Sequence, residues 1–148
     1  MSFNRDAALF LGSWELLSYE LRRTSGAVEK PMGDGPLGRL LYLENGQMSA
    51  QVIGSRLDLL ASADPDEATP QEAERAWRNY IGYWGTYAVD AAAGVVIHAV
   101  EGAWFPNWIG KKQIRQYLFV ADQLTLEADS PSWHAKLVWQ RMESSPRG

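Results

Sequence analysis

Two side chains in this sequence suit proton transfer or anion binding from within a structured segment, His98 and Arg115. His98 lies in the middle of the apolar stretch "GVVIHAVEG", where Val96, Val100 and Gly102 would share its face of a strand. A histidine with a pKa near neutrality can act as a general acid or base. On an apolar face a lone histidine is more often a hydrogen-bonded core residue, so both interpretations stay open.

Arg115 lies in the next alternating segment, "KQIRQYLFV", together with Tyr117. A buried guanidinium must find an acceptor, so an inward Arg115 would bind an anion or a carbonyl oxygen. A hairpin across "FPNWIGKK" would bring Arg115 or Tyr117 near His98. Which face points inward is open, because Gln113, Arg115, Tyr117 and Phe119 compete with Ile114, Gln116 and Leu118. If the protein is an enzyme, His98 and Arg115 are its candidate catalytic residues.

Other catalytic or metal-binding arrangements find little support. Glu101 is three residues from His98 and would point to the opposite face of a regular strand, unless a bulge near Gly102 intervenes. His134 is expected to be exposed. Two histidines on different strands and no cysteine argue against a metal site, and we expect no cofactor. No nucleophile elbow, phosphate-binding loop or dinucleotide motif is present.

The elements that position these residues are mostly strands. "GRLLYLENGQMSAQVIG" predicts a hairpin with a two-residue turn at Asn45-Gly46. Further turns are predicted from Asp90 to Gly94 and at Asp122-Gln123, and a weaker strand in "GAVEK". About eight or nine strands with no alternating helices predict an all-β protein. An antiparallel up-and-down barrel removes exposed edges and is favoured over a flat sandwich.

Two helices interrupt this pattern. A short one, "DAALFL", is capped by Asn4 or Asp6 and ends at Gly12. A second spans 70–81, because Thr69 and Glu72 form a capping box with a proline at the first helical position. Its predicted apolar face consists of Ala73, Ala76, Trp77, Tyr80 and Ile81.

In the first strand, 13–23, the direction of Trp14 decides which other side chains are expected to point inward. If Trp14 points inward, regular alternation places Leu16, Ser18 and Glu20 inward and Leu17, Tyr19 and Leu21 outward. Large aromatics with a polar tip suit the lining of a pocket for a mostly apolar compound. The candidate ligand-binding residues are Ser18, Tyr42, Met48, Tyr87, Trp104, Trp108 and Tyr117.

Composition limits the functional classes. The 148 residues are 46% hydrophobic and 22% charged, which is typical of one globular domain, and we place no boundary within 1–148. A net charge of −4 argues against nucleic-acid binding, and no apolar run is long enough to span a membrane. The N-terminal segment does not resemble a signal peptide. We expect an intracellular, cytoplasmic protein that is a monomer or homodimer.

The sequence resembles the bacterial lipocalin-like domain proteins over nearly its whole length. The resemblance rests on "LGSWELLSYE", "PMGDGPLGRLLYLENGQMSAQV", "YIGYWGTYAVD", "HAVEGAWFPNWIG" and "LTLEA…LVWQR". It implies a small barrel with a central pocket for an apolar or amphipathic molecule. It also implies that Trp14 closes one barrel end and stacks with an arginine near the last strand, here Arg141, through a cation–π contact.

Three functions are consistent with this reading. The leading one is binding of a small hydrophobic or amphipathic molecule, with the 70–81 helix and the "FPNW" loop framing one mouth. The second is a cofactor-free cyclase or isomerase of secondary metabolism, which needs shape and a few hydrogen-bond donors. The third is a structural or stress protein whose barrel is filled by its own aromatic side chains.

Overall fold

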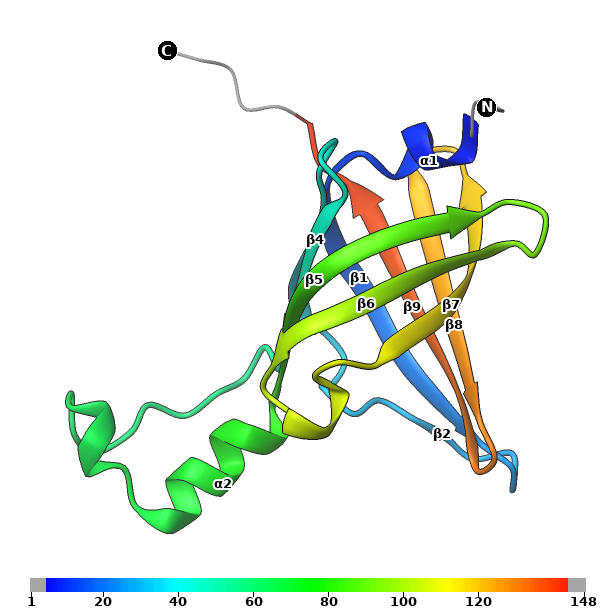
Figure 1. The fold of residues 1–148 in the computed structure, drawn as a ribbon. Helices are drawn as coiled ribbons and strands as arrows, with labels where there is room; N and C mark the ends of the chain where they lie inside the picture. Colours follow the sequence, from blue (N-terminus) through cyan, green and yellow to red (C-terminus); the bar gives the residue numbers. More distant parts are fainter. Residues whose placement is uncertain (1–4, 144–148) are drawn as a thin grey trace.

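The computed structural model describes residues 5–143 and forms a closed antiparallel barrel (Figure 1). Eight strands follow one another around the barrel, and β1 pairs with β9 to close it. The strands are β1 (Gly12–Arg23), β2 (Val28–Glu29), β3 (Leu37–Tyr42), β4 (Gln47–Ile53), β5 (Tyr80–Asp90), β6 (Val95–Ala103), β7 (Lys112–Val120), β8 (Gln123–Ser130) and β9 (Trp133–Arg141). The short β2 pairs only with the end of β1 and is not one of these eight strands. The predicted up-and-down barrel is therefore confirmed.

Period-two alternation builds the wall. In β4, Met48, Ala50 and Val52 are buried while their neighbours are partly or fully exposed. In β8, Leu124, Leu126 and Ala128 repeat the pattern. Because successive side chains of a strand point to opposite faces, each strand presents one face to the barrel interior and one to solvent.

Two tight turns differ from prediction. The β3–β4 loop comprises the four residues from Leu43 to Gly46, with the amide of Leu43 donating to the carbonyl of Gln47 (2.9 Å) and that of Gly46 to the carbonyl of Leu43 (3.0 Å). Gly46 alone has a positive φ (86°), so this is a turn followed by a left-handed glycine and not a two-residue turn. The β7–β8 turn is Ala121-Asp122, where Ala121 has φ 52°.

A bulge in β1 changes which of its side chains point inward, compared with the prediction. Trp14 and Leu16 are buried as expected, but the register against β9 shifts between Leu16 and Ser18. The extra residue inverts the alternation, so Tyr19 and Leu21 face the interior and line the cavity described below. The prediction that Ser18 and Glu20 point inward is therefore wrong, since it assumed a regular strand.

One end of the barrel is closed by helix α1 (Arg5–Phe10) (Figure 1). Phe10 is fully buried and makes edge contacts with the rings of Tyr42, Tyr117 and Phe119, at centroid distances of 5.1, 5.0 and 4.9 Å. The Asp6 carboxylate accepts a hydrogen bond from the Tyr117 hydroxyl and so ties the helix to β7. Asn4, the alternative cap, lies outside the described residues.

Trp14 and Arg141 complete this closed end. The Trp14 indole donates to the carbonyl of Phe10 (2.9 Å), and the Arg141 guanidinium lies 4.2 Å from the centre of the Trp14 ring. Arg141 also donates to the carbonyl of Leu11 (2.8 Å). The predicted cation–π contact is confirmed, and it links the start of β1 to the end of β9.

Helix α2 (Pro70–Arg78) lies at the opposite end and extends away from the barrel (Figure 1). Its predicted capping box is confirmed, with Thr69 accepting from the amide of Glu72 (3.2 Å) and Glu72 from that of Thr69 (2.9 Å). The helix ends three residues earlier than predicted, because Tyr80 already begins β5. No residue of α2 is buried, so its apolar face covers no core.

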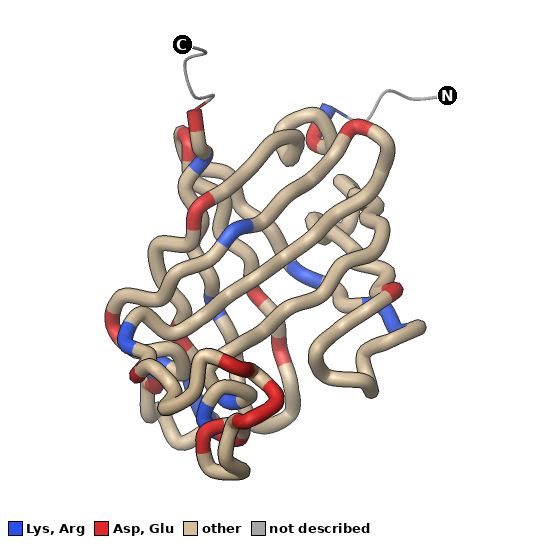
Figure 2. Tube along the Cα trace, turned by 90° about the vertical axis from the view of Figure 1, so that its left-hand side faces the viewer, with Lys and Arg blue, Asp and Glu red and all other residues tan. Residues whose placement is uncertain are grey.

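Two short 3₁₀ helices lie in the loops at this end, η1 (Pro65–Glu67) before α2 and η2 (Pro106–Trp108) between β6 and β7. Acidic side chains gather in the loop before α2 and in α2 itself, at the lower end of the view in Figure 2. Among residues 5–143, no helix has the length and hydropathy needed to cross a membrane.

Candidate functional site

The barrel contains a cavity of about 500 Å³. Its lining includes His98 in the barrel interior and, at the other end, Trp77 of α2 and Trp108 of η2. We call the end of the cavity beside α2 and η2 the mouth. Most of the wall is apolar, with Met32, Leu40 and Leu126 among its members. A cavity of this size matches the usual range for small-molecule sites. The cavity favours the two small-molecule functions over a barrel filled by its own side chains.

His98 is the most buried polar side chain of this cavity, with 1% of its surface exposed. Its Nε2 is 2.7 Å from the Tyr42 hydroxyl, and its Nδ1 is 2.7 Å from the Tyr83 hydroxyl. Burial, reinforced by the nearby charge of Arg115, lowers the pKa of His98 to about 3. At neutral pH His98 is an uncharged imidazole with both ring nitrogens hydrogen-bonded.

The two tyrosines are also held in their neutral form. Burial is the main cause that raises the pKa of Tyr42 and of Tyr83 above the usual value for a phenol. Tyr83 lines the cavity, whereas Tyr42 packs at the closed end against Phe10 and Tyr87. The imidazole thus connects a hydroxyl at the cavity wall with one in the core.

Arg115 faces the cavity, which resolves the open question about β7. Ile114 and Leu118 point outward and are 57% and 58% exposed, while Gln113 and Arg115 line the cavity. The Arg115 guanidinium donates to the side chain of Gln113 and to the carbonyl of Ile114, both at 3.2 Å. No described residue forms an ion pair with Arg115. It is a cation directed at the same space as His98.

Aromatic rings form the mouth. Trp104 packs edge-on to Trp108 at 5.1 Å, Tyr83 to Trp108 at 5.5 Å, and Trp77 lies 5.8 Å from Trp104. The indole Nε1 atoms of Trp104 and Trp139 are buried and have no hydrogen-bond partner within the described part of the chain. Both indole rings line the cavity, although their Nε1 atoms are themselves buried.

The predicted site residues separate into two groups. Four of them line the cavity: His98, Arg115, Trp104 and Trp108. The other five do not: Ser18, Tyr42, Met48, Tyr87 and Tyr117. The β1 bulge displaces Ser18, and Met48 is buried in the core. Tyr87 donates to the carbonyl of Leu43 (2.9 Å) and Tyr117 to Asp6, so both hydroxyls are used at the closed end.

A family model for the lipocalin-like domain matches residues 11–142. The chain belongs to the lipocalin-like domain family. It is also similar to the 4'-hydroxy-3'-methoxypropiophenone carrier protein ppsC of Aspergillus oryzae. The two are 33% identical over 90 residues, which cover 57% of this chain and 81% of that protein.

Several residues of this lipocalin-like cavity were not assigned to it from the sequence. They include Tyr19, Trp77, Tyr83, Trp133 and Trp139. Tyr83 could have been found, because it shares a strand face with Tyr87 and lies opposite the "FPNW" segment in the expected meander. Tyr19 could not, because its facing depends on the bulge.

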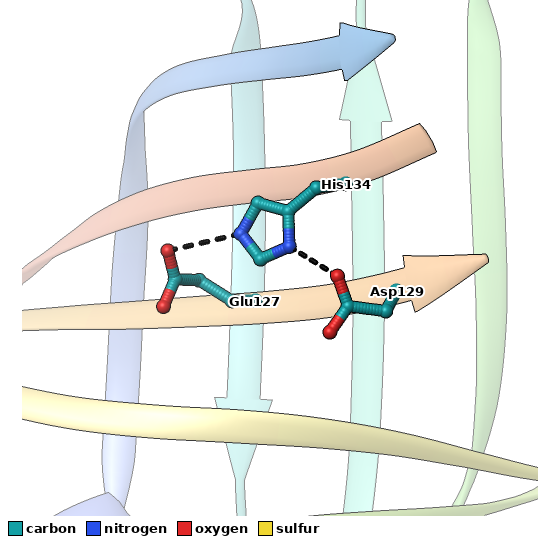
Figure 3. Close-up of polar contacts among 3 residues, drawn as sticks. All are labelled: Glu127, Asp129 and His134. Atoms are coloured by element: carbon teal, nitrogen blue, oxygen red, sulfur yellow. Dashed lines mark hydrogen bonds and ion pairs between the residues drawn. The ribbon is translucent and has the colours of Figure 1, made fainter. Parts of the chain in front are cut away.

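His134 lies on the outside of the lipocalin-like barrel, as predicted, between two carboxylates of β8 (Figure 3). Its Nε2 is 3.2 Å from Glu127, and its Nδ1 is hydrogen-bonded to Asp129. These bonds raise the pKa of His134. Glu101 is exposed and does not contact His98, although the register against β5 does shift beside it. Within residues 5–143, no cluster of His, Asp and Glu could hold a metal ion.

Proposed function

We propose that this protein binds a small, mostly apolar organic molecule inside the barrel. The observation that carries the proposal is the cavity of about 500 Å³, walled by aliphatic and aromatic side chains and containing a few polar groups. The family supports a binding role, and the similar carrier protein supports an aromatic ligand. The named ligand of that relative is an aromatic ketone and is the first compound to test.

Titration with 4'-hydroxy-3'-methoxypropiophenone, followed by tryptophan fluorescence, tests this proposal. Five tryptophans line the cavity, so an occupant is expected to change their emission. The blocking variant is Ala128→Trp, because Ala128 lies in the cavity wall and a bulky ring there would occupy the space of the ligand. Affinity is expected to fall at least tenfold, which corresponds to about 1.4 kcal/mol.

The matched control is Thr125→Trp, which places the same ring on the outward face of the same strand. This variant is expected to bind as the wild type does. Circular dichroism melting establishes that both variants are folded. If both folded variants bind with unchanged affinity, the ligand does not occupy the barrel, and the proposal is wrong.

A second candidate function is a cofactor-free cyclase or isomerase. One observation favours it: Tyr83, His98 and Arg115 lie together at a mostly apolar cavity, where such groups can polarise a carbonyl or hold a proton. His98→Ala and Arg115→Ala separate the two functions. Loss of turnover of a candidate substrate with binding retained would indicate catalysis, and equal loss of both would indicate binding alone.

A further inference from the structure

The hydrogen-bond chain through His98 determines which way the Tyr83 hydroxyl points. A neutral imidazole carries one N–H donor and one bare nitrogen acceptor. Because both nitrogens contact a tyrosine hydroxyl, one tyrosine donates to His98 and the other accepts from it. Two arrangements are possible, and they differ in which tyrosine keeps a free O–H.

The surroundings of Tyr42 select one arrangement. Tyr42 is 1% exposed and does not line the cavity, and among the described residues its hydroxyl is hydrogen-bonded only to His98. If Tyr42 accepted from His98, its own O–H would be buried without an acceptor, which proteins strongly avoid. Tyr42 therefore donates to Nε2. The proton of the imidazole is then on Nδ1, which donates to Tyr83.

This arrangement leaves the O–H of Tyr83 free at the cavity wall. The oxygen of Tyr83 accepts from Nδ1, so its proton is available to another acceptor. Burial keeps the pKa of Tyr83 above the ordinary value, so the proton is retained at neutral pH. In the opposite arrangement the Tyr83 proton would be used by His98, and the cavity would receive no donor from this tyrosine.

Arg115 supplies a second donor near the same place. A guanidinium has five N–H groups, and the two hydrogen bonds described above leave others unused. Its positive charge opposes the burial that raises the pKa of Tyr83 and adds to the burial that lowers the pKa of His98, which places the charge close to both. The Nε1 atoms of Trp104 and Trp139 are buried and have no partner among the described residues, so the accessible donors of the site are those of Tyr83 and Arg115.

The lining contains no acidic side chain among the described residues. The polar groups of the cavity are therefore mainly donors with one uncompensated cation, and the complementary ligand must supply acceptors. We propose that the cavity recognises an aromatic or similarly apolar molecule through a ketone or carboxylate oxygen, held by the Tyr83 hydroxyl and the Arg115 guanidinium. This inference rests on the proposed function and adds the chemistry that selects the ligand.

The first test needs no ligand. In protein labelled with ¹⁵N-histidine, the imidazole nitrogen shifts report which nitrogen carries the proton, and His134→Gln assigns the two described histidines. The His98 signals are expected to show Nδ1 protonated and Nε2 bare between pH 6 and 8. Tyr42→Phe removes the donor to Nε2 and is expected to give a mixture of tautomers. Protonation at Nε2 in the wild type would overturn the inference.

The second test compares three ligands of nearly equal shape: 2-acetylnaphthalene, 2-naphthoate and 2-ethylnaphthalene. The wild type is expected to bind the ketone or the carboxylate at least tenfold more tightly than the hydrocarbon, and whichever is tighter identifies the acceptor. Tyr83→Phe is expected to reduce this preference for both oxygen compounds. Arg115→Met is expected to reduce it most for the carboxylate. Affinity for 2-ethylnaphthalene is expected to persist in both variants.

Tyr87→Phe is the matched control, since it removes a hydroxyl from the same strand that is bonded to the Leu43 carbonyl outside the cavity. It is expected to retain the wild-type preference. Equal affinity of the wild type for all three ligands would overturn the inference and leave the proposed function standing. Failure of all three ligands to bind would overturn both.

Discussion

His98 is uncharged in the folded protein and gains a proton readily once the chain unfolds. Its pKa is about 3 when folded, against 6.5 for an unperturbed histidine. Between these values the unfolded state binds more protons, so acid favours unfolding. We predict that His98 causes the free energy of unfolding to fall by up to about 1.4 kcal/mol for each pH unit below 6.5. Urea unfolding from pH 7 to 4.5 measures this slope.

His98→Gln serves as the comparison, because glutamine offers a donor and an acceptor but does not titrate in this range. Carboxylates contribute equally to both proteins, so the difference between the two slopes belongs to His98. His134 affects stability in a different pH range. Because its pKa is raised in the folded protein, its contribution to the free energy of unfolding is lost as the pH rises above 6.5. Parallel curves for the wild type and His98→Gln below pH 6.5 would contradict the assignment of a neutral buried imidazole.

Trp14 holds the closed end together and takes no part in the cavity. Trp14→Ala removes a fully buried indole, its hydrogen bond to Phe10 and the surface on which Arg141 stacks. We predict a loss of about 3–5 kcal/mol in the free energy of unfolding, the range for a deleted core aromatic. Ligand affinity is expected to change little wherever the variant is folded. A variant as stable as the wild type would contradict the structural role of Trp14.

Helix α2 contributes to the mouth and not to the core. Trp77 is 46% exposed, yet it lines the cavity and packs against Trp104. Trp77→Ala is therefore predicted to change stability by less than about 1 kcal/mol. It is expected to weaken ligand binding about tenfold, because the exposed part of the ring would cover the occupant. Calorimetric titration and thermal melting measure the two effects.

Trp84 provides the control for Trp77, because it is 57% exposed on the outer wall, over Gly102. Trp84→Ala is expected to leave the affinity unchanged. If both variants lose affinity to the same extent, the mouth does not lie beside α2.

The strands followed from the sequence because alternation and turn residues agree, and the up-and-down barrel was favoured because closing the sheet removes its exposed edges. Which side chains of each strand point into the barrel was harder to predict. In β7 the outward Ile114, Leu118 and Val120 are apolar and the inward Gln113 and Arg115 are polar. This reverses the usual rule, because the interior there is a cavity and not a packed core. In β1 a single bulge reversed the facing of every residue after it.

The candidate site was only half predicted for the same reason. His98 and Arg115 were identified by their chemistry, whereas the tyrosines were treated as one group. Tyr42 and Tyr83 are hydrogen-bonded to the same imidazole although the two residues lie 41 positions apart in the sequence. Which hydroxyl is buried in the core and which reaches the cavity depends on the closure of the barrel around Phe10. Sequence patterns carry no signal for that depth.

The whole molecule is a barrel with two dissimilar ends. The α1 end is sealed by Phe10, Trp14 and Arg141, and the α2 end is ringed by aromatic side chains. Acidic residues lie in the outer loop and α2 (Figure 2), outside the lining, whereas Arg115 is part of the cavity lining. A closed bottom, an aromatic mouth and a cationic interior suit a receptor for a small molecule that enters beside α2.

Ligand binding inside the barrel is tested most directly by recording the indole N–H signals in a ¹⁵N–¹H spectrum during titration with 4'-hydroxy-3'-methoxypropiophenone. The seven tryptophans report on three places in the molecule. We predict shifts for the cavity-lining indoles of Trp77, Trp104, Trp108, Trp133 and Trp139, and unchanged signals for Trp14 at the closed end and Trp84 on the outer wall. Shifts confined to Trp84, or no shift of any indole at saturating concentration, would contradict ligand binding within the barrel.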